Sequence, residues 1–312
     1  MTGFVLRVPA SSANLGPGFD SLGLALALYN TVVVESPASG LEIEIEGEGL
    51  GVLPSDANNL VIRAARARCK TKNSALPGMR IRMVNGIPVG AGLGSSAAAA
   101  LAGMALADVL ANGEISKEDL LGPAFELEGH PDNAAAALFG GLVLVTIAGG
   151  RPISRRVPIP ELMVALALPD LKLPTQTMRR ALPKTVSLKA AASNIGLAAL
   201  TVEALRHEDY DLLAQVSQDH LHQPHRKSFI PGFDRVVDAG KQAGAAAVVL
   251  SGAGPSLVAF AADGHAAIAE AMVEAFKAVG LEARSLILGA DMEGLTFTQN
   301  PDAAQSEFPI QR

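Results

Sequence analysis

The most distinctive segment of this chain reads Pro88-Val89-Gly90-Ala91-Gly92-Leu93-Gly94-Ser95-Ser96-Ala97-Ala98. It follows a predicted strand, Arg80–Val84, and leads into an alanine-rich predicted helix at about Ser95–Leu110. Glycine has no Cβ atom, so three glycines at alternate positions let backbone N–H groups converge on a ligand, and the helix N-terminus adds positive partial charge. The segment therefore predicts a phosphate-binding loop. Ser95 and Ser96 would either cap the helix or offer hydroxyls to a phosphate or a magnesium ion.

Two common phosphate-binding patterns do not fit this loop. A Walker-A loop needs Gly-Lys-Ser/Thr, and no lysine lies between Lys72 and Lys117. The dinucleotide pattern G-x-G-x-x-G is absent because the three glycines are evenly spaced. A plain tight turn with a serine helix cap is the structural alternative, but such a turn does not need this many glycines.

Composition indicates a globular protein of two domains. The chain has 312 residues, 49% of them hydrophobic and 18% charged, which excludes disorder driven by charge. A single cysteine, Cys69, excludes a fold held by internal disulfides. The net charge of −6 argues against nonspecific binding to nucleic acid. The N-terminus lacks signal-peptide features, Ala97–Ala107 is too short to span a membrane, and Ala243–Ala262 is interrupted by polar residues. We therefore expect a cytoplasmic protein that binds neither membrane nor nucleic acid.

Strand and helix patterns alternate along the chain. The predicted strands are Phe4–Val8, Asn30–Glu35, Leu41–Glu46, Arg80–Val84, Leu142–Ile147, Leu162–Leu168, Ala245–Leu250, Ser256–Ala261 and Ala283–Leu288. The predicted helices are Asn59–Lys72, Ser95–Leu110, Ser187–Leu205, Tyr210–Leu221 and His265–Val279. A polar, proline-bearing segment, Gly149–Glu161, predicts the domain boundary. We therefore expect domains at residues 1–155 and 156–295, followed by a polar tail at 296–312.

Three motifs, taken together, resemble the GHMP kinase superfamily. Pro88–Ala98 is similar to its phosphate-binding motif, and Ser251-Gly252-Ala253-Gly254-Pro255-Ser256 is similar to its C-terminal glycine motif. Ala10-Ser11-Ser12-Ala13-Asn14-Leu15-Gly16-Pro17-Gly18-Phe19-Asp20 resembles the N-terminal motif of the homoserine kinase family within it. The resemblance implies an α+β fold with two domains. The first would be a mixed α/β domain with a left-handed crossover, and the second a ferredoxin-like domain, with the site at their interface.

Further segments favour the homoserine kinase family over other branches. Glu128-Gly129-His130-Pro131-Asp132-Asn133 resembles its segment at this place, whereas mevalonate kinases tend to carry Pro-Ser-Gly-x-Asp. Thr175 and Arg179 resemble its pair of substrate contacts, and the segment ending in Arg226 resembles one that supplies an arginine. The implied activity is transfer of phosphate from ATP to the hydroxyl of L-homoserine, in threonine biosynthesis.

The resemblance also implies roles for individual residues. ATP would lie in the 88–98 loop, with Asn59 at the adenine. Mg²⁺ would be held by Ser96 and one carboxylate, Glu128 or alternatively Glu126, because magnesium takes few protein ligands. The residues implied to bind homoserine are Asn14, Asp20, His130, Asn133, Thr175, Arg179, Arg226 and Gly252. Arg179 and Arg226 suit its carboxylate, Asn14 and Asp20 its ammonium, and His130 and Asn133 its hydroxyl. Asp132 is a candidate base, although an asparagine stands at the matching place in homoserine kinases.

Simpler interpretations remain open for several of these residues. Asn14 and Asp20 could stabilise turns in a glycine-rich loop, Arg179 could form a surface pair with Arg180, and Asp132 and Asn133 could belong to a plain loop. His220, His222 and His225 do not share one helix face, which argues against zinc. Two rival functions also remain, another GHMP small-molecule kinase of the mevalonate type and a catalytically silent nucleotide-binding relative. A homodimer is a further expectation that the sequence does not decide.

Overall fold

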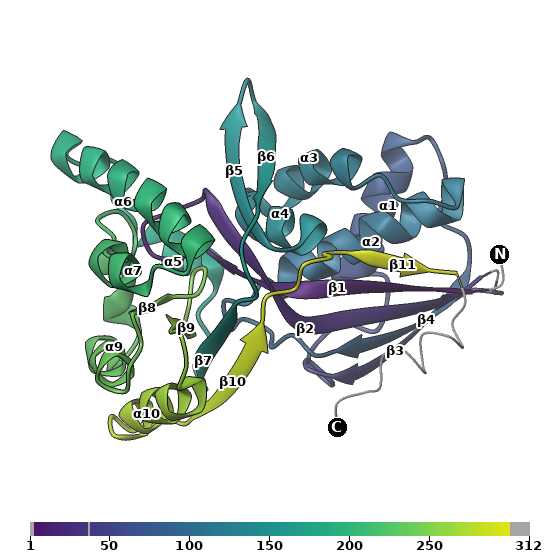
Figure 1. Cartoon of the computed structure of the whole chain (residues 1–312). Coiled ribbons are helices and arrows are strands. Elements are labelled where there is room, and N and C mark those ends of the chain that lie inside the picture. The colour runs from purple at the N-terminus through teal and green to yellow at the C-terminus, as the bar shows by residue number, and fades with distance from the viewer. Residues whose placement is uncertain (1–2, 37, 300–312) are drawn as a thin grey trace.

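The computed structural model describes residues 3–36 and 38–299, and it contains two sheets (Figure 1). The larger sheet has the strand order β11-β1-β2-β4-β3, and β5 joins it by pairing with both β2 and β6. Only β3 and β4 pair in parallel, and the other strand pairs of this sheet are antiparallel. Its strands are β1 (Phe4–Ala13), β2 (Leu22–Glu35), β3 (Leu41–Gly47), β4 (Met79–Asn85), β5 (Leu142–Ala148), β6 (Arg151–Val157) and β11 (Thr296–Thr298).

Four helices cover one face of the larger sheet (Figure 1). They are α1 (Leu60–Thr71), α2 (Ser95–Asn112), α3 (Lys117–Glu128) and α4 (Asp132–Phe139). The small residues of α2 allow close packing, because a Cβ atom on Gly103 would collide with the backbone carbonyl of Val61 on α1. The abundance of alanine and glycine in this segment therefore reflects how tightly the helix is buried.

The smaller sheet is antiparallel throughout, with the order β10-β7-β9-β8. In chain order this is a 4-1-3-2 arrangement with helices after its first and third strands, which is the ferredoxin-like pattern expected from the sequence. Its strands are β7 (Met163–Pro169), β8 (Ala247–Leu250), β9 (Leu257–Phe260) and β10 (Ala283–Gly289). Its helices are α5 (Thr175–Arg180), α6 (Leu188–His207), α7 (Tyr210–Val216), α8 (Gln223–Arg226), α9 (Phe233–Gln242) and α10 (His265–Lys277).

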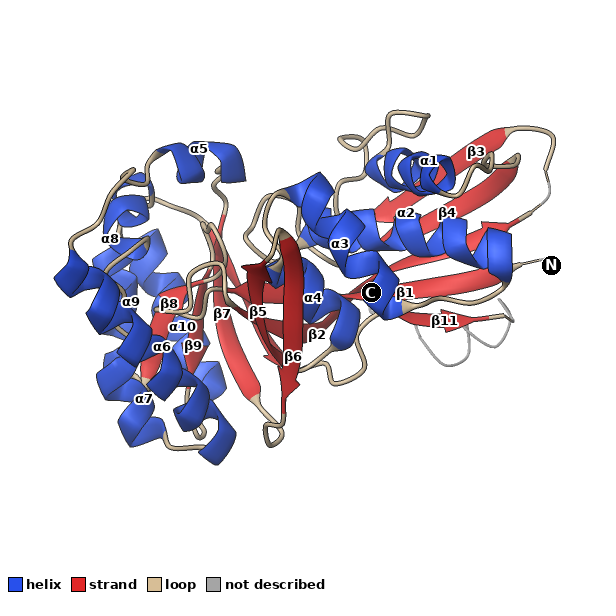
Figure 2. Cartoon of the chain, turned by 90° about the horizontal axis from the view of Figure 1, so that it is seen from above, coloured by secondary structure: helices blue, strands red, loops and turns tan. Residues whose placement is uncertain are grey.

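The two sheets share one hydrophobic core. The main buried cluster includes Leu6 and Leu24 of the larger sheet together with Val164 and Phe260 of the smaller one. A second cluster lies between the smaller sheet and the helices α9 and α10. Figure 2 shows the two sheets meeting near β2, β5 and β7, so that loops from both come together there.

The structure differs from the sequence-based expectations at the domain boundary and at the tail. Residues Arg151–Val157, expected to be a linker, form β6 and pair with β5 along its length. The expected boundary at residue 155 therefore falls inside a strand, and we propose that it lies after β6. Residues Thr296–Thr298, expected to begin the tail, form β11 and pair with β1. The rest of that expected tail, residues 300–312, lies outside the described residues.

Helix lengths also depart from expectation. The helix expected to reach Leu221 ends at Val216, because the Asp219 side chain accepts hydrogen bonds from the backbone N–H groups of the next turn. Among the described residues, α2 and α6 are long and apolar enough to cross a membrane by length and composition alone. Two-thirds of α2 is buried inside the protein, whereas most of α6 is exposed.

Candidate active site

The glycine loop joins β4 to α2 in a conformation that side chains rarely adopt. Gly90, Gly92 and Gly94 have φ angles of +74°, +81° and +70°. A Cβ atom on Gly92 would collide with the backbone of the second glycine motif, at Ser251 and Gly254. The N-cap of α2 is Gly94, so Ser95 and Ser96 are its first helical residues and do not cap it. Their hydroxyls therefore stay available to a ligand at the helix N-terminus.

Ser96 lies directly against Glu128 at the end of α3. Its Oγ donates to the carboxylate, 2.6 Å from Oε1 and 2.5 Å from Oε2. Helix α3 ends at Glu128 because Gly129 follows in the left-handed conformation, with φ +79°. Glu126, the alternative magnesium ligand, is exposed and does not line the pocket. The geometry therefore favours Glu128.

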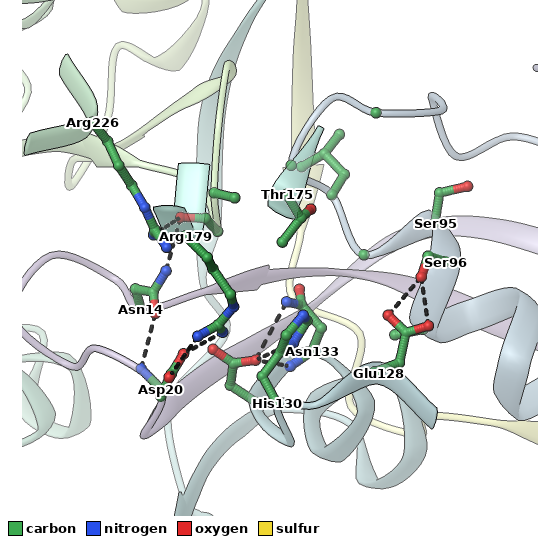
Figure 3. Close-up of a pocket in the computed structure, with 18 of the residues that line it drawn as sticks. Asn14, Asp20, Ser95, Ser96, Glu128, His130, Asn133, Thr175, Arg179 and Arg226 are labelled. Atoms are coloured by element: carbon green, nitrogen blue, oxygen red, sulfur yellow. Dashed lines mark hydrogen bonds and ion pairs between the residues drawn. The ribbon is translucent and has the colours of Figure 1, made fainter. Parts of the chain in front are cut away.

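The loop after β1 brings two polar residues to the same place. Asn14 and Asp20 both have positive φ angles, +71° and +53°. The Asn14 Nδ2 donates to the carbonyl of Gly252 at 2.8 Å, and its Oδ1 accepts from the backbone N–H of Asp20 at 3.0 Å. Asn14 thus holds the loop against the C-terminal glycine motif, and the Asp20 carboxylate faces the pocket (Figure 3).

Two arginines approach the pocket from the smaller sheet's helices. Arg179 of α5 donates to both carboxylate oxygens of Asp20, at 2.7 and 3.0 Å. Burial opposes the charge of Arg179, but its hydrogen bonds to Asp20 raise its pKa above the ordinary value. Arg226 of α8 is only 1% exposed, and no carboxylate of the described residues lies within 4 Å of its guanidinium. Burial and the charge of Arg179 lower the pKa of Arg226 to about 10.

A buried cation without an acidic partner is costly, so this arrangement is typical of an anion site. At neutral pH Arg226 still carries its charge. The carboxylate of Asp20 already compensates Arg179. A ligand carboxylate would therefore stabilise the charge of Arg226 more than that of Arg179.

The start of α4 supplies the third side of the pocket. Asp132 is buried, and its Oδ1 accepts from the backbone N–H of Asn133 at 2.8 Å. The Asn133 Oδ1 accepts from the Ser11 hydroxyl at 3.0 Å, which ties α4 to β1. His130 Nδ1 lies 3.4 Å from Asp132 Oδ1 without hydrogen-bond geometry. Asp132 and Asn133 are thus the first two residues of a helix and not part of the plain loop that was the alternative for them.

One pocket gathers nearly all of the residues singled out in the sequence. In Figure 3, Ser96 and Glu128 lie at one end, Asp20 and Arg179 at the other, with His130 and Asn133 between them. The pocket is lined by Asn14, Asp20, Pro88, Gly90, Gly92, Leu93, Gly94, Ser95, Ser96, Ala97, Glu128, His130, Asp132, Asn133, Thr175, Arg179, Arg226, Gly252 and Ala253. The expected residues that do not line it are Val89, Ala91, Ala98, Asn59 and Glu126.

Asn59, expected to contact adenine, has a different place in the structure. It is buried and caps α1, accepting from the backbone N–H of Val61 at 3.0 Å and donating to the carbonyl of Pro54 at 2.7 Å. Conversely, sequence reasoning missed the residues behind the pocket, such as Phe19 and His222. The only signal for His222 was its place in a histidine-rich segment, which had been considered for zinc.

The donor set suits a magnesium ion. Mg²⁺ prefers oxygen ligands and keeps several of its waters or phosphate oxygens. A serine hydroxyl and a glutamate carboxylate in contact beside a helix N-terminus match that preference. The described residues contain no group of three or more His, Cys, Asp or Glu side chains arranged to hold a metal by themselves.

Comparison with known proteins places the chain in a family. The family model described as "GHMP kinases N terminal domain" matches residues 59–141, and "GHMP kinases C terminal" matches residues 201–278. The homoserine kinase of Desulfitobacterium hafniense is 40% identical over 93% of this chain and 98% of its own length. The homoserine kinase structure from Cytophaga hutchinsonii is 31% identical, covers 96% of this chain and 98% of its own, and has a TM-score of 0.85.

A more distant structure shares the fold alone. The mevalonate kinase of Methanococcus jannaschii has a TM-score of 0.68 at 15% identity, and covers 92% of this chain and 98% of its own. The first family model covers the loop before α2, and the second covers β8 and β9 of the smaller sheet. This chain belongs to the GHMP kinases and, within them, to the homoserine kinase family.

Proposed function

We propose that the chain transfers the γ-phosphoryl group of ATP to the hydroxyl of L-homoserine, giving O-phospho-L-homoserine for threonine biosynthesis. The observation that carries this proposal is that one pocket joins a glycine loop at a helix N-terminus to two arginines suited to an amino-acid carboxylate. The first end binds a polyphosphate, and the second binds a small zwitterion. The family membership given above supplies the reaction class.

Phosphoryl transfer depends mainly on positioning and charge neutralisation. The backbone N–H groups of the 90–96 loop and the α2 N-terminus would bind the ATP phosphates. Ser96 and Glu128 would hold Mg²⁺, whose charge neutralises phosphate oxygens when it is bound. No acidic side chain other than Glu128 lines that end of the pocket, so it remains open to an anion.

The other end would orient the acceptor. Arg226 would bind the homoserine carboxylate, with Arg179 beside it, and the carboxylate of Asp20 would attract the ammonium group. His130 and Asn133, which lie between the two ends, would hold the hydroxyl toward the phosphate. The hydroxyl proton has two candidate routes, to Asp132 or to the phosphate itself. Asp132 Oδ1 already accepts from Asn133, which favours a role in holding Asn133.

A coupled assay of ADP release tests this function. We expect ADP release to depend on homoserine and to be slower with mevalonate at equal concentration. An Arg179→Ala variant should raise the KM for homoserine about tenfold or more, because it removes a charge-assisted contact. Arg180→Ala is the matched control, since Arg180 is the exposed neighbour on α5. Equal or faster turnover of mevalonate would contradict the substrate assignment, and absence of ADP release with every alcohol would favour a silent relative.

A further inference from the structure

His222 is buried behind the pocket and contacts two of the elements that form it. The side chain has no exposed surface, and its ring stacks on Phe19 with centroids 5.2 Å apart. Its Nε2 lies 2.8 Å from the carbonyl oxygen of Gly16, in the loop that carries Asn14 and Asp20. Its Nδ1 lies 3.2 Å from Nη1 of Arg226. The ring therefore connects this loop to Arg226.

The partners of the two ring nitrogens determine where its proton lies. Nε2 faces two oxygen atoms, the Gly16 carbonyl and, at 3.5 Å, Oδ2 of Asp219. Nδ1 faces an arginine N–H group, which can only donate. His222 must then carry its proton on Nε2 and accept with Nδ1, so it is neutral.

The protein binds the Nε and Nη1 atoms of the Arg226 guanidinium and leaves Nη2 without an acceptor among the described residues. One Nη1 hydrogen goes to His222 and the other to the carbonyl of Gly252 at 3.2 Å, while Nε approaches the carbonyl of Met178 at 3.4 Å. No described residue accepts a hydrogen bond from Nη2. The guanidinium lies over the Phe19 ring, 5.4 Å from its centroid. These contacts leave the Nη2 donors for a ligand in the pocket that Arg226 lines.

We propose that His222 is a positioning residue for substrate binding. Through Nδ1 it orients Arg226 toward the substrate carboxylate, and through Nε2–H it holds the 14–20 loop at the same pocket. It does not touch the substrate itself. The proposal rests on the proposed function, in which Arg226 binds the carboxylate of homoserine.

Burial favours the neutral form of His222. Burial is the main cause that lowers the pKa of His222, and the charge of Arg226 acts in the same direction. The carboxylates of Asp219 and Asp20 oppose this effect and do not overcome it. Protonation of Nδ1 would remove its acceptor and place a second positive charge beside Arg226. The orienting contact is therefore present at neutral pH and lost below the pKa of folded His222, which lies under 6.5.

Two substitutions separate the contacts of the ring. His222→Asn keeps an acceptor near the position of Nδ1, whereas His222→Gln keeps a donor near the position of Nε2. We expect the Gln variant to raise the KM for homoserine about tenfold, as for loss of one hydrogen bond to a charged group, and the Asn variant clearly less. The KM for ATP and kcat should change much less in both. His225→Gln, on the short helix α8 that follows His222, is the control and should leave the kinetics unchanged.

Homoserine KM measured against pH provides a second readout. Wild-type KM should rise as the pH falls through the lowered pKa of His222, and this rise should be absent in His222→Asn, while effects of ATP titration remain in both proteins. NMR of wild-type protein with ¹⁵N-labelled histidine avoids the risk that variants fail to fold. We expect the His222 signal, identified by its absence from whichever of His222→Asn and His222→Gln folds, to be that of the neutral Nε2–H tautomer at pH 7.

The outcomes distinguish this proposal from the proposed function. Equal KM increases in the Asn and Gln variants, or a protonated or Nδ1–H His222 at pH 7, would overturn the positioning role. A wild-type protein that does not phosphorylate homoserine would overturn the proposed function, whatever the tautomer of His222.

Discussion

At the scale of the residue, the position of Glu128 on α3 decides which ligand it can hold. It is the last residue of α3, and its carboxylate accepts from the Ser96 hydroxyl in the first turn of α2. Glu126, two residues earlier, lies on a different side of the helix and is exposed. The fold therefore distinguishes Glu128, the preferred candidate, from Glu126, the alternative.

We expect Glu128→Gln to lower kcat by about 100-fold, because it removes a negatively charged magnesium ligand while keeping the shape of the side chain. Glu126→Gln is the matched control and should leave kcat unchanged. The assay is ADP release at saturating homoserine with Mg²⁺ varied, and the Glu128 variant should need more Mg²⁺ for half-maximal rate. A larger effect at Glu126 would show that the metal site is assigned to the wrong carboxylate.

At the scale of the element, an ion-pair cluster joins α1 to α2 in addition to the apolar contact between the two helices. Asp108 of α2 is buried and accepts from Arg68 Nε at 2.8 Å and Nη2 at 2.9 Å, with Lys72 Nζ also 2.8 Å away. Arg63 and Arg66, on the same helix as Arg68, are exposed. Of these arginines of α1, Arg63 and Arg66 are therefore exposed to solvent, and Arg68 is paired with Asp108.

Asp108→Asn should lower the free energy of unfolding by about 2–3 kcal/mol, because it leaves two cations without their buried partner. Burial raises the pKa of Asp108, but its hydrogen bonds to Arg68 and Lys72 outweigh burial and lower that pKa below 3.8. The stabilisation is therefore present above about pH 4 and lost as the pH falls through the folded-state value. Urea unfolding at pH 7 and pH 3 measures it, with the exposed Asp238→Asn as control. A loss that is as large at pH 3 as at pH 7 would contradict the ion-pair explanation.

Sequence reasoning recovered the elements whose signals are local and missed those that depend on distant partners. The glycine loop and α2 follow from adjacent residues, so their positions were predictable. Strand β6 contains three arginines and is mostly exposed, and it is a strand because β5 lies beside it. Asn59 caps α1, a common role of an asparagine before a helix, and its contact with adenine stays a prediction. His222 was missed because its partners, Gly16 and Arg226, meet it only in the fold.

At the scale of the whole molecule, the smaller sheet is an insertion between β6 and β11 of the larger sheet. The chain leaves the larger sheet after Val157 and returns at Thr296 to pair with β1. Phe297 of β11 packs edge-on against Phe4 of β1, with ring centroids 5.8 Å apart and planes at 69°. This closing strand makes the stability of the two units interdependent.

We expect Phe297→Ala to lower the free energy of unfolding by about 2 kcal/mol, since it removes a half-buried ring that packs against the main core. Calorimetry should still show a single transition, because the units share that core. Phe229→Ala, at a more exposed phenylalanine, is the control and should cost much less. Separation of the Phe297→Ala transition into two would show that the units are held together mainly through β11.

The pairing of β1 with β11 also bears on how the chain is made. Of the described strands, β1 is the first that a ribosome would synthesise and β11 is the last. The outer edge of β1 at Val5, Leu6 and Arg7 must therefore wait for residues 296–298, which emerge only after the whole inserted unit. An unpaired strand edge is a site for unwanted pairing with other chains. The nascent protein thus carries this unpaired edge of β1 while the inserted unit is synthesised, and the larger sheet is complete only when β11 pairs with β1.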